Sequence, residues 1–217
     1  MEIEWIDVRT DVDTYDWKGN PIHLKNVPAL KNPKTGKIRI YPANVSKAEF
    51  ATYAAESGLE PRDVAILLML YAKPGPFPRG IQPLGYRLNK SLFYQWKDME
   101  KRLLGEVFPR DVFVAADRGP VPVNLKSDLE RLEKIGLVNL RWTRWGKGKL
   151  QQSMTINLTN KGMEIAESLW KKVPEPFRKV TLTVKERIFP LDPKTIRERV
   201  HREYPEYKKT YTELDTD

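Results

Sequence analysis

Apolar residues recur at helical spacing along most of the chain after residue 45, whereas the first 45 residues show no helical period. That early segment is rich in proline, asparagine and glycine, with turn signals at residues 16–20 (DWKGN) and 32–36 (NPKTG). The second signal suits a type I turn that places Gly36 in the left-handed conformation and closes a short hairpin. We therefore predict an N-terminal extension of hairpins and loops over residues 1–45, followed by a helical domain over residues 46–217.

Caps and apolar runs mark the first helices of this domain. Ser46 and Glu49 have the spacing of a capping box, and Gly58 is a stop signal for the helix that they start. Pro61 suits the first turn of the next helix. Residues 64–72 (VAILLMLYA) are apolar on every side, which predicts a buried central helix.

The pattern predicts further elements with different clarity. Asn89 can cap a third helix, and a short strand is expected over residues 111–115. Residues 178–189 do not favour one type of element, whereas residues 193–203 indicate a last helix. The apolar residues of the third helix recur at helical spacing: Leu92, Phe93, Trp96, Met99 and Leu103.

The clearest succession is helix, glycine, strand, turn, strand and capped helix. The helix has apolar residues that step by four, three and three: Leu125, Leu129, Leu132 and Ile135. Gly136 is its expected stop, and strands are expected over residues 137–145 and 151–158 around a Gly-Lys-Gly turn at residues 146–148. Thr159 can cap the helix that follows.

This succession carries the pattern L-x-x-L-x-x-x-G-L-V, a hairpin, and L-T-x-x-G-x-x-I-A. The residues that match are Leu129, Leu132, Gly136, Leu137, Val138, Leu158, Thr159, Gly162, Ile165 and Ala166. Over residues 119–171 the chain resembles the winged-helix half of MarR-type transcription regulators. The resemblance implies an α+β, mainly α winged helix-turn-helix domain with a β-hairpin wing. It implies a recognition helix before the wing, whose groove-facing positions are Asn124, Lys126, Ser127 and Arg131. The wing positions that it implies are Arg144, Lys147 and Lys149.

A second set of motifs spans residues 62–212 and begins with the buried apolar helix. The other motifs are Lys90-Ser-Leu-Phe-Tyr94, Arg118-Gly-Pro-Val121 and Tyr204-Pro-Glu-Tyr207. This set resembles the Panacea (SocA-like) domain and its winged-helix relatives, although the first 60 residues and the Trp/Arg hairpin lie outside that pattern. Panacea domains occur as antitoxins, so the resemblance implies a toxin-like protein partner. The tail tyrosines, Tyr204, Tyr207 and Tyr211, are expected to pack on the core. The alternative is a homodimer surface, since winged-helix regulators commonly pair through terminal helices.

Charge favours a polyanionic partner. The net charge is +9, and it is unevenly distributed: residues 1–16 sum to −5, whereas residues 17–47 carry seven cations and no acid. The basic face of the N-terminal extension could contact a polyanion or lie as a solvated flap over the core. The predicted wing has four cations and no acid: Arg141, Arg144, Lys147 and Lys149. We predict that these cations contact the phosphates of double-stranded DNA.

The predicted recognition helix favours DNA less clearly, because its three cations are balanced by three acids: Asp128, Glu130 and Glu133. Acids beside a phosphate backbone are unfavourable, so this helix leaves room for a protein partner. Asp128 could instead lie on the protein side or pair with Arg131 three residues on. The main prediction is a DNA-binding transcriptional regulator, and the alternative is a protein-interaction module like a Panacea antitoxin.

Other classes of function find little support in the residue types. Without cysteine the chain has no disulfide, thiolate metal site or cysteine nucleophile. Its two histidines, His23 and His201, are isolated, and no phosphate-binding glycine loop or metal motif appears. We therefore expect no catalytic activity, metal or cofactor. The acidic start is unlike a signal peptide, and the apolar run over residues 64–72 is too short to cross a bilayer. The expected location is the cytoplasm.

Overall fold

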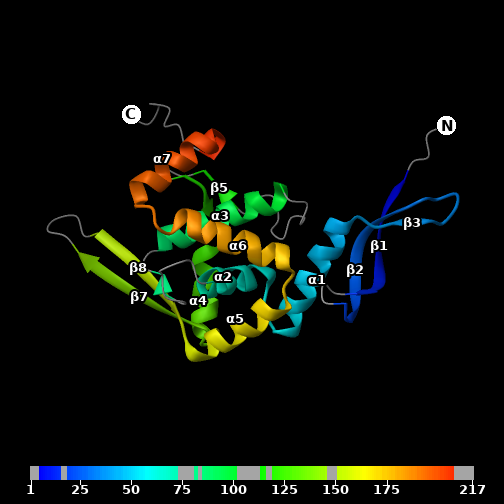
Figure 1. Cartoon of the computed structure of the whole chain (residues 1–217), viewed down its shortest axis with the longest axis horizontal. Coiled ribbons are helices and arrows are strands. Elements are labelled where there is room, and N and C mark those ends of the chain that lie inside the picture. Colours follow the sequence, from blue (N-terminus) through cyan, green and yellow to red (C-terminus); the bar gives the residue numbers. More distant parts are fainter. Residues whose placement is uncertain are drawn as a thin grey trace, which may run out of the picture.

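The computed structural model describes the following parts of the 217-residue chain: residues 5–15, 19–72, 81–82, 85–101, 113–115, 119–145 and 151–207. Within them the chain has mixed α+β structure, with a small N-terminal sheet beside a larger body of helices (Figure 1). A second small sheet projects from the other side of this body (Figure 1).

The N-terminal sheet has the strand order β1-β2-β3 and is antiparallel throughout: β1 (Ile6–Tyr15), β2 (Pro21–Lys31) and β3 (Ile38–Arg39). β1 and β2 pair from end to end, apart from a bulge between Thr10 and Val12. The chain then reverses through a turn in which Gly36 has a φ of +72°, so this residue occupies the left-handed region. The hairpins predicted for the extension are confirmed by this pairing, and so is the turn at residues 32–36, whereas residues 16–18 of the other predicted turn lie outside the described residues.

The helical body is built around a central helix. Its helices are α1 (Pro42–Glu56), α2 (Pro61–Tyr71), α3 (Gly85–Lys101), α4 (Leu125–Lys134), α5 (Asn160–Lys172), α6 (Glu175–Ile188) and α7 (Pro193–Glu203). A 3-10 turn, Pro205–Tyr207, follows α7. Every residue of α2 from Asp63 to Tyr71 is buried, and the helix contacts α1, α3, α4, α5 and α6. The predicted buried central helix is therefore confirmed, with Pro61 in its first turn.

The second sheet contains the predicted hairpin and has the order β4-β8-β7: β4 (Ile81–Gln82), β8 (Gln151–Leu158) and β7 (Val138–Trp145). The strands β5 (Phe113–Val114) and β6 (Val121–Pro122) pair separately. Gly136 ends α4 with a φ of +76°, and the Thr159 hydroxyl accepts a hydrogen bond from the Gly162 N–H at 2.9 Å. The stop and the cap predicted at these two positions are confirmed.

Two predicted helix starts were wrong. α1 begins at Pro42 rather than at Ser46, because proline at the first helical position already has the required φ. Glu49 does not act in a capping box, since it is buried and accepts a hydrogen bond from the Tyr53 hydroxyl at 2.9 Å. α3 begins at Gly85, so Asn89 lies inside the helix and not at its cap.

Residues 178–189, which the sequence left open, lie mainly in α6. One side of this helix is buried: Phe177, Val180, Thr181, Val184, Lys185 and Ile188. A lysine and a threonine interrupt the apolar spacing on that side, which explains why the pattern was indecisive. Separately, none of the helices in the described segments has the length and the apolar character needed to cross a bilayer.

Candidate nucleic-acid interface

The outer face of α4 holds three of the residues expected to face a DNA groove. Asn124 precedes the helix, and Lys126 and Ser127 lie in its first turn; all three are exposed. The Ser127 hydroxyl donates to the backbone oxygen of Asn124 at 2.9 Å. Lys126 lies 3.7 Å from Glu130, and both side chains are more than half exposed. Such an exposed pair is weak, so Lys126 can exchange its carboxylate partner for a phosphate at little cost.

The inner face of α4 is joined to α2 by charged side chains. The Arg131 guanidinium donates to Asp63 at 2.6 Å and to Asp128 at 3.1 Å. The Arg62 guanidinium donates to the same oxygen of Asp128 at 3.0 Å. Both carboxylates are almost completely buried, whereas the two arginines keep partial solvent access. Arg131, which was expected at the groove, is therefore committed to holding α4 against α2.

Asp128 lies on the protein side, as one interpretation of the sequence proposed. Burial raises its pKa more than the neighbouring guanidinium groups of Arg62 and Arg131 lower it. The hydrogen bond to Asp63 is the main cause that raises the pKa of Arg131. Because Asp128 points inward, the outer face of α4 is less acidic than the sequence suggests.

The remaining acids of α4 are also partly engaged. Glu130 pairs with Lys126, and Glu133 accepts a hydrogen bond from the backbone N–H of Leu140 at 2.8 Å. The second contact joins α4 directly to the first half of β7. It places the hairpin strand beside the helix that precedes it.

The end of the hairpin is fastened to α4 and α5 by a close backbone approach. The Thr159 hydroxyl donates to the Gly136 oxygen at 2.7 Å, and the Thr159 N–H donates to the Leu137 oxygen at 3.1 Å. A Cβ at Gly162 would lie only 2.0 Å from that same Leu137 oxygen. Glycine is therefore required where α5 crosses the start of the hairpin.

The wing cations are only partly within the described structure. Arg141 lies in β7 opposite Thr155 and is exposed. The side chains of Arg144, Lys147 and Lys149 lie outside the described residues. The structure thus brings Asn124, Lys126 and Ser127 together on one helix, with Arg141 on the adjoining hairpin.

The motifs behind the second resemblance meet in the core. The Lys90 ammonium donates to the Pro120 oxygen at 2.6 Å, and the Phe93 ring packs edge-on against the rings of Tyr204 and Tyr207, with centroids 5.0 and 4.9 Å away. A Cβ at Gly119 would be 3.7 Å from the Lys90 Cε. These residues therefore form a packed cluster, and the predicted packing of Tyr204 and Tyr207 on the core is confirmed. Tyr211 lies outside the described residues.

Two lysines are fully buried without a carboxylate partner among the described residues. Burial lowers the pKa of Lys90 to about 7 and that of Lys185 to about 7. The Lys185 amine donates to the Leu70 oxygen at 3.1 Å and to the Ala72 oxygen, where α2 ends. Both amines thus satisfy backbone carbonyls inside the body, which is a structural role.

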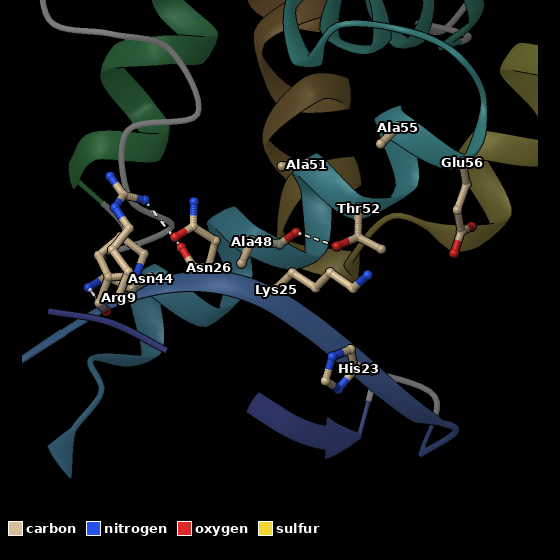
Figure 2. A pocket seen from close by; sticks show the side chains of 11 residues that line it. Arg9, His23, Lys25, Asn26, Asn44, Ala48, Ala51, Thr52, Ala55 and Glu56 are labelled. Carbon is tan, nitrogen blue, oxygen red and sulfur yellow. Dashed lines mark hydrogen bonds between the residues drawn. The ribbon is translucent and has the colours of Figure 1, made fainter. Parts of the chain in front are cut away.

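A groove of about 540 Å³ lies between the N-terminal sheet and α1. Figure 2 shows Ala48, Ala51 and Ala55 of α1 on one side of this groove, with His23 and Lys25 of β2 on the other. His23 is held by Asp13 at 2.7 Å, and Glu56 by Lys172 at 3.2 Å. The groove is remote from α4 and β7 (Figure 1), so it is separate from the candidate interface.

The described residues contain no group of three or more His, Cys, Asp or Glu side chains placed to hold a metal ion. Comparison of the chain with protein-family models, with curated proteins and with solved structures found no match.

Sequence reasoning missed the part played by Arg62 and Asp63. The available signal was a charged pair at the start of a helix that is otherwise apolar. Their partners, Asp128 and Arg131, are more than 60 residues away in the sequence. Periodicity cannot reveal a pairing of that kind.

Proposed function

We propose that the chain is a winged-helix protein that binds double-stranded DNA, with α4 as the groove-reading helix and the β7–β8 hairpin as its wing. The observation that carries the proposal is the division of α4 into two faces. Its charged inner face is bound to α2, while Asn124, Lys126 and Ser127 remain exposed beside a hairpin with an exposed Arg141. A recognition helix needs this combination of a fixed position and exposed polar side chains.

The proposed contacts differ in kind. Asn and Ser side chains can hydrogen-bond to base edges, whereas Lys126 and the wing cations suit phosphates. Arg131 is a positioning residue in this scheme, since its guanidinium is used on Asp63 and Asp128. As a transcriptional regulator the protein would read its operator through α4 and gain affinity through the wing.

The arrangement departs from the usual helix-turn-helix in one respect. α3 ends at Lys101 and α4 begins at Leu125, so the two helices are not joined by a turn of three or four residues. The ion pairs between α2 and α4 take over the task of orienting the recognition helix. For this reason we propose that α2, and not α3, holds the recognition helix α4 in position.

The test is fluorescence anisotropy on a labelled mixed-sequence duplex across a salt series. The wing variant Arg144→Ala/Lys147→Ala/Lys149→Ala is compared with Lys171→Ala/Lys179→Ala/Lys194→Ala, which removes three exposed lysines from α5, α6 and α7. The salt slope is the slope of the logarithm of the binding constant against the logarithm of the salt concentration. We expect the wing variant to lose about three units of this slope, at roughly 0.9 per phosphate contact, and the control to lose less than about one. Failure of the wild-type protein to bind at low salt would contradict the proposal.

One observation favours a protein partner instead. Val123 and Ile135, at the two ends of α4, are 54% and 41% exposed, and Glu130 lies between them on the outer face. Exposed apolar side chains on a helix that also carries an exposed carboxylate suit a protein surface better than a phosphate backbone. A Panacea-like antitoxin would co-purify with a specific protein partner and would show no salt-dependent binding to the duplex.

A further inference from the structure

The β2–β3 hairpin is a second concentration of positive charge, far from the wing. Its cations are all exposed: Lys31, Lys34, Lys37 and Arg39. The sequence has no acid between residues 17 and 47. Among the described residues, no carboxylate lies within ion-pair distance of any of the four. The three lysines are thus not neutralised by carboxylates of the described residues, which leaves them available to a polyanion, while the Arg39 guanidinium lies 4.7 Å from the centroid of the Trp5 ring.

The turn that presents these cations is ordered by Asn32. This side chain is 5% exposed, and its amide oxygen accepts hydrogen bonds from the N–H groups of Lys34 at 2.9 Å and Thr35 at 3.1 Å. The Asn32 oxygen of the backbone also accepts from the Gly36 N–H at 2.8 Å. A turn that is already ordered loses less conformational entropy on binding than a flexible loop does.

The register distributes the charges over both faces of the hairpin. Lys31 pairs with Ile38, and Leu30 pairs with Arg39. Because successive residues of a strand point to opposite faces, the side chains of Lys31 and Arg39 lie on opposite faces, with Lys34 in the turn between the strands. Cations on both faces suit a tip that enters a groove with phosphates along each wall.

The hairpin has a fixed place on the body. The Asn44 amide of α1 donates to the Pro28 oxygen of β2 at 2.8 Å, and Leu24 and Val27 of the same strand are fully buried. The β2–β3 and β7–β8 hairpins lie toward opposite ends of the longest axis of the molecule (Figure 1). A ligand that meets both must therefore extend along the molecule.

We propose that the β2–β3 hairpin is a second phosphate-contacting element for the same DNA duplex. This inference rests on the proposed function and adds the requirement that the duplex be long enough to reach both hairpins. A duplex of 10 base pairs is about 34 Å long and one of 30 base pairs is about 100 Å. Only the longer one should engage both hairpins at once.

The experiment measures the salt slope of Lys31→Ala/Lys34→Ala/Lys37→Ala on labelled duplexes of both lengths. The matched control is again Lys171→Ala/Lys179→Ala/Lys194→Ala, and Lys31→Arg/Lys34→Arg/Lys37→Arg keeps the charge. On the long duplex the alanine variant should lose about 2 to 3 units of slope, at roughly 0.9 per contact. The arginine variant should keep the wild-type slope. On the short duplex the loss should fall below about one unit.

The outcomes separate this inference from the function on which it rests. If the alanine variant matches the control on both duplexes while the wing variant still loses slope, the hairpin is no DNA contact and the proposed function stands. If the loss is equally large on both duplexes, the spanning geometry is wrong. If the wild-type protein binds neither duplex at low salt, both proposals fail.

Discussion

The two basic hairpins of this protein differ in how they are held. Three side chains fasten the base of the β7–β8 hairpin and the helices on either side of it. Glu133 bonds to the backbone of Leu140 in β7, Thr159 bonds to that of Gly136, and Lys161 joins α5 to the Ile135 oxygen at the end of α4. The turn of the β2–β3 hairpin is ordered by one of its own residues, Asn32. The first hairpin is thus part of the helical body, while the second extends from a sheet at its edge (Figure 1).

This difference suggests a division of work under the proposed function. Reading bases requires the recognition helix and the wing to keep a fixed geometry, because base contacts depend on the register of the protein on the duplex. Contacts to phosphates tolerate small displacements, since they carry no sequence information directly. A braced hairpin beside α4 meets the first need, and a charged hairpin at a distance meets the second.

The largest effect is expected from Gly162→Ala, which disrupts the close packing of α5 against the start of the β7–β8 hairpin. The new Cβ would lie 2.0 Å from the backbone oxygen of Leu137, so α5 or the start of β7 must shift. We expect a loss of about 3 kcal/mol in the free energy of unfolding, the upper end for overpacked sites. Urea denaturation measures it. Ser168→Ala, at an exposed position of the same helix, is the control and should change the free energy by less than about 0.5 kcal/mol.

The sequence correctly predicted where the helices on either side of the β7–β8 hairpin end and begin, because the signals for these boundaries are local. Gly136 stops one helix and Thr159 caps another, and these two signals depend only on residues within three or four positions, whereas the hydrogen bond between Thr159 and Gly136 is a long-range contact that the sequence does not show. The hairpin turn of the N-terminal extension was predictable for the same reason. Interactions between residues that are close in the sequence can be predicted from the sequence alone.

Long-range partners explain what the sequence did not reveal. Lys185 lies on the buried side of α6 because it bonds to carbonyls at the end of α2, more than 110 residues earlier. Arg131 turns inward because Asp63 on α2 accepts its hydrogen bond. A cation on a helix looks the same in the sequence whether its partner is a buried carbonyl, a buried carboxylate or a phosphate. The candidate site could thus be located from the sequence, but its free and committed cations could not be distinguished.

The stability of the helical body should depend on pH, whereas the local opening of the N-terminal sheet should not. The pKa of Lys185 is about 7 in the folded protein and about 10.4 in an unfolded chain, so the unfolded state binds more protons between these values. Stability should therefore rise with pH between about pH 7.5 and 9.5, with a contribution from Lys185 of about 1 kcal/mol per pH unit. Lys185→Met should remove that part of the slope.

The matched control for the pH series is Lys179→Met, an exposed lysine of the same helix, which should leave the slope unchanged. Both fully buried lysines of the described residues belong to the helical body, and neither is in the N-terminal sheet. Local opening of the β2–β3 pairing, measured by hydrogen exchange corrected for the intrinsic pH effect, should thus stay constant. Equal slopes in Lys185→Met and the wild-type protein would contradict the lowered pKa of this buried amine.

The smallest effect is expected from Asn32→Ala, which removes order from the β2–β3 turn and leaves its charges in place. Losing the acceptor for the Lys34 and Thr35 N–H groups should cost about 1 kcal/mol locally, so these amides should exchange about fivefold faster. Global stability should change little. DNA affinity should fall less than about tenfold with an unchanged salt slope, because every cation remains. Asn32→Asp keeps the acceptor but adds a negative charge, so it should lower the slope. If Asn32→Ala lowered the slope as much as Asn32→Asp, order of the turn rather than charge alone would determine the contact.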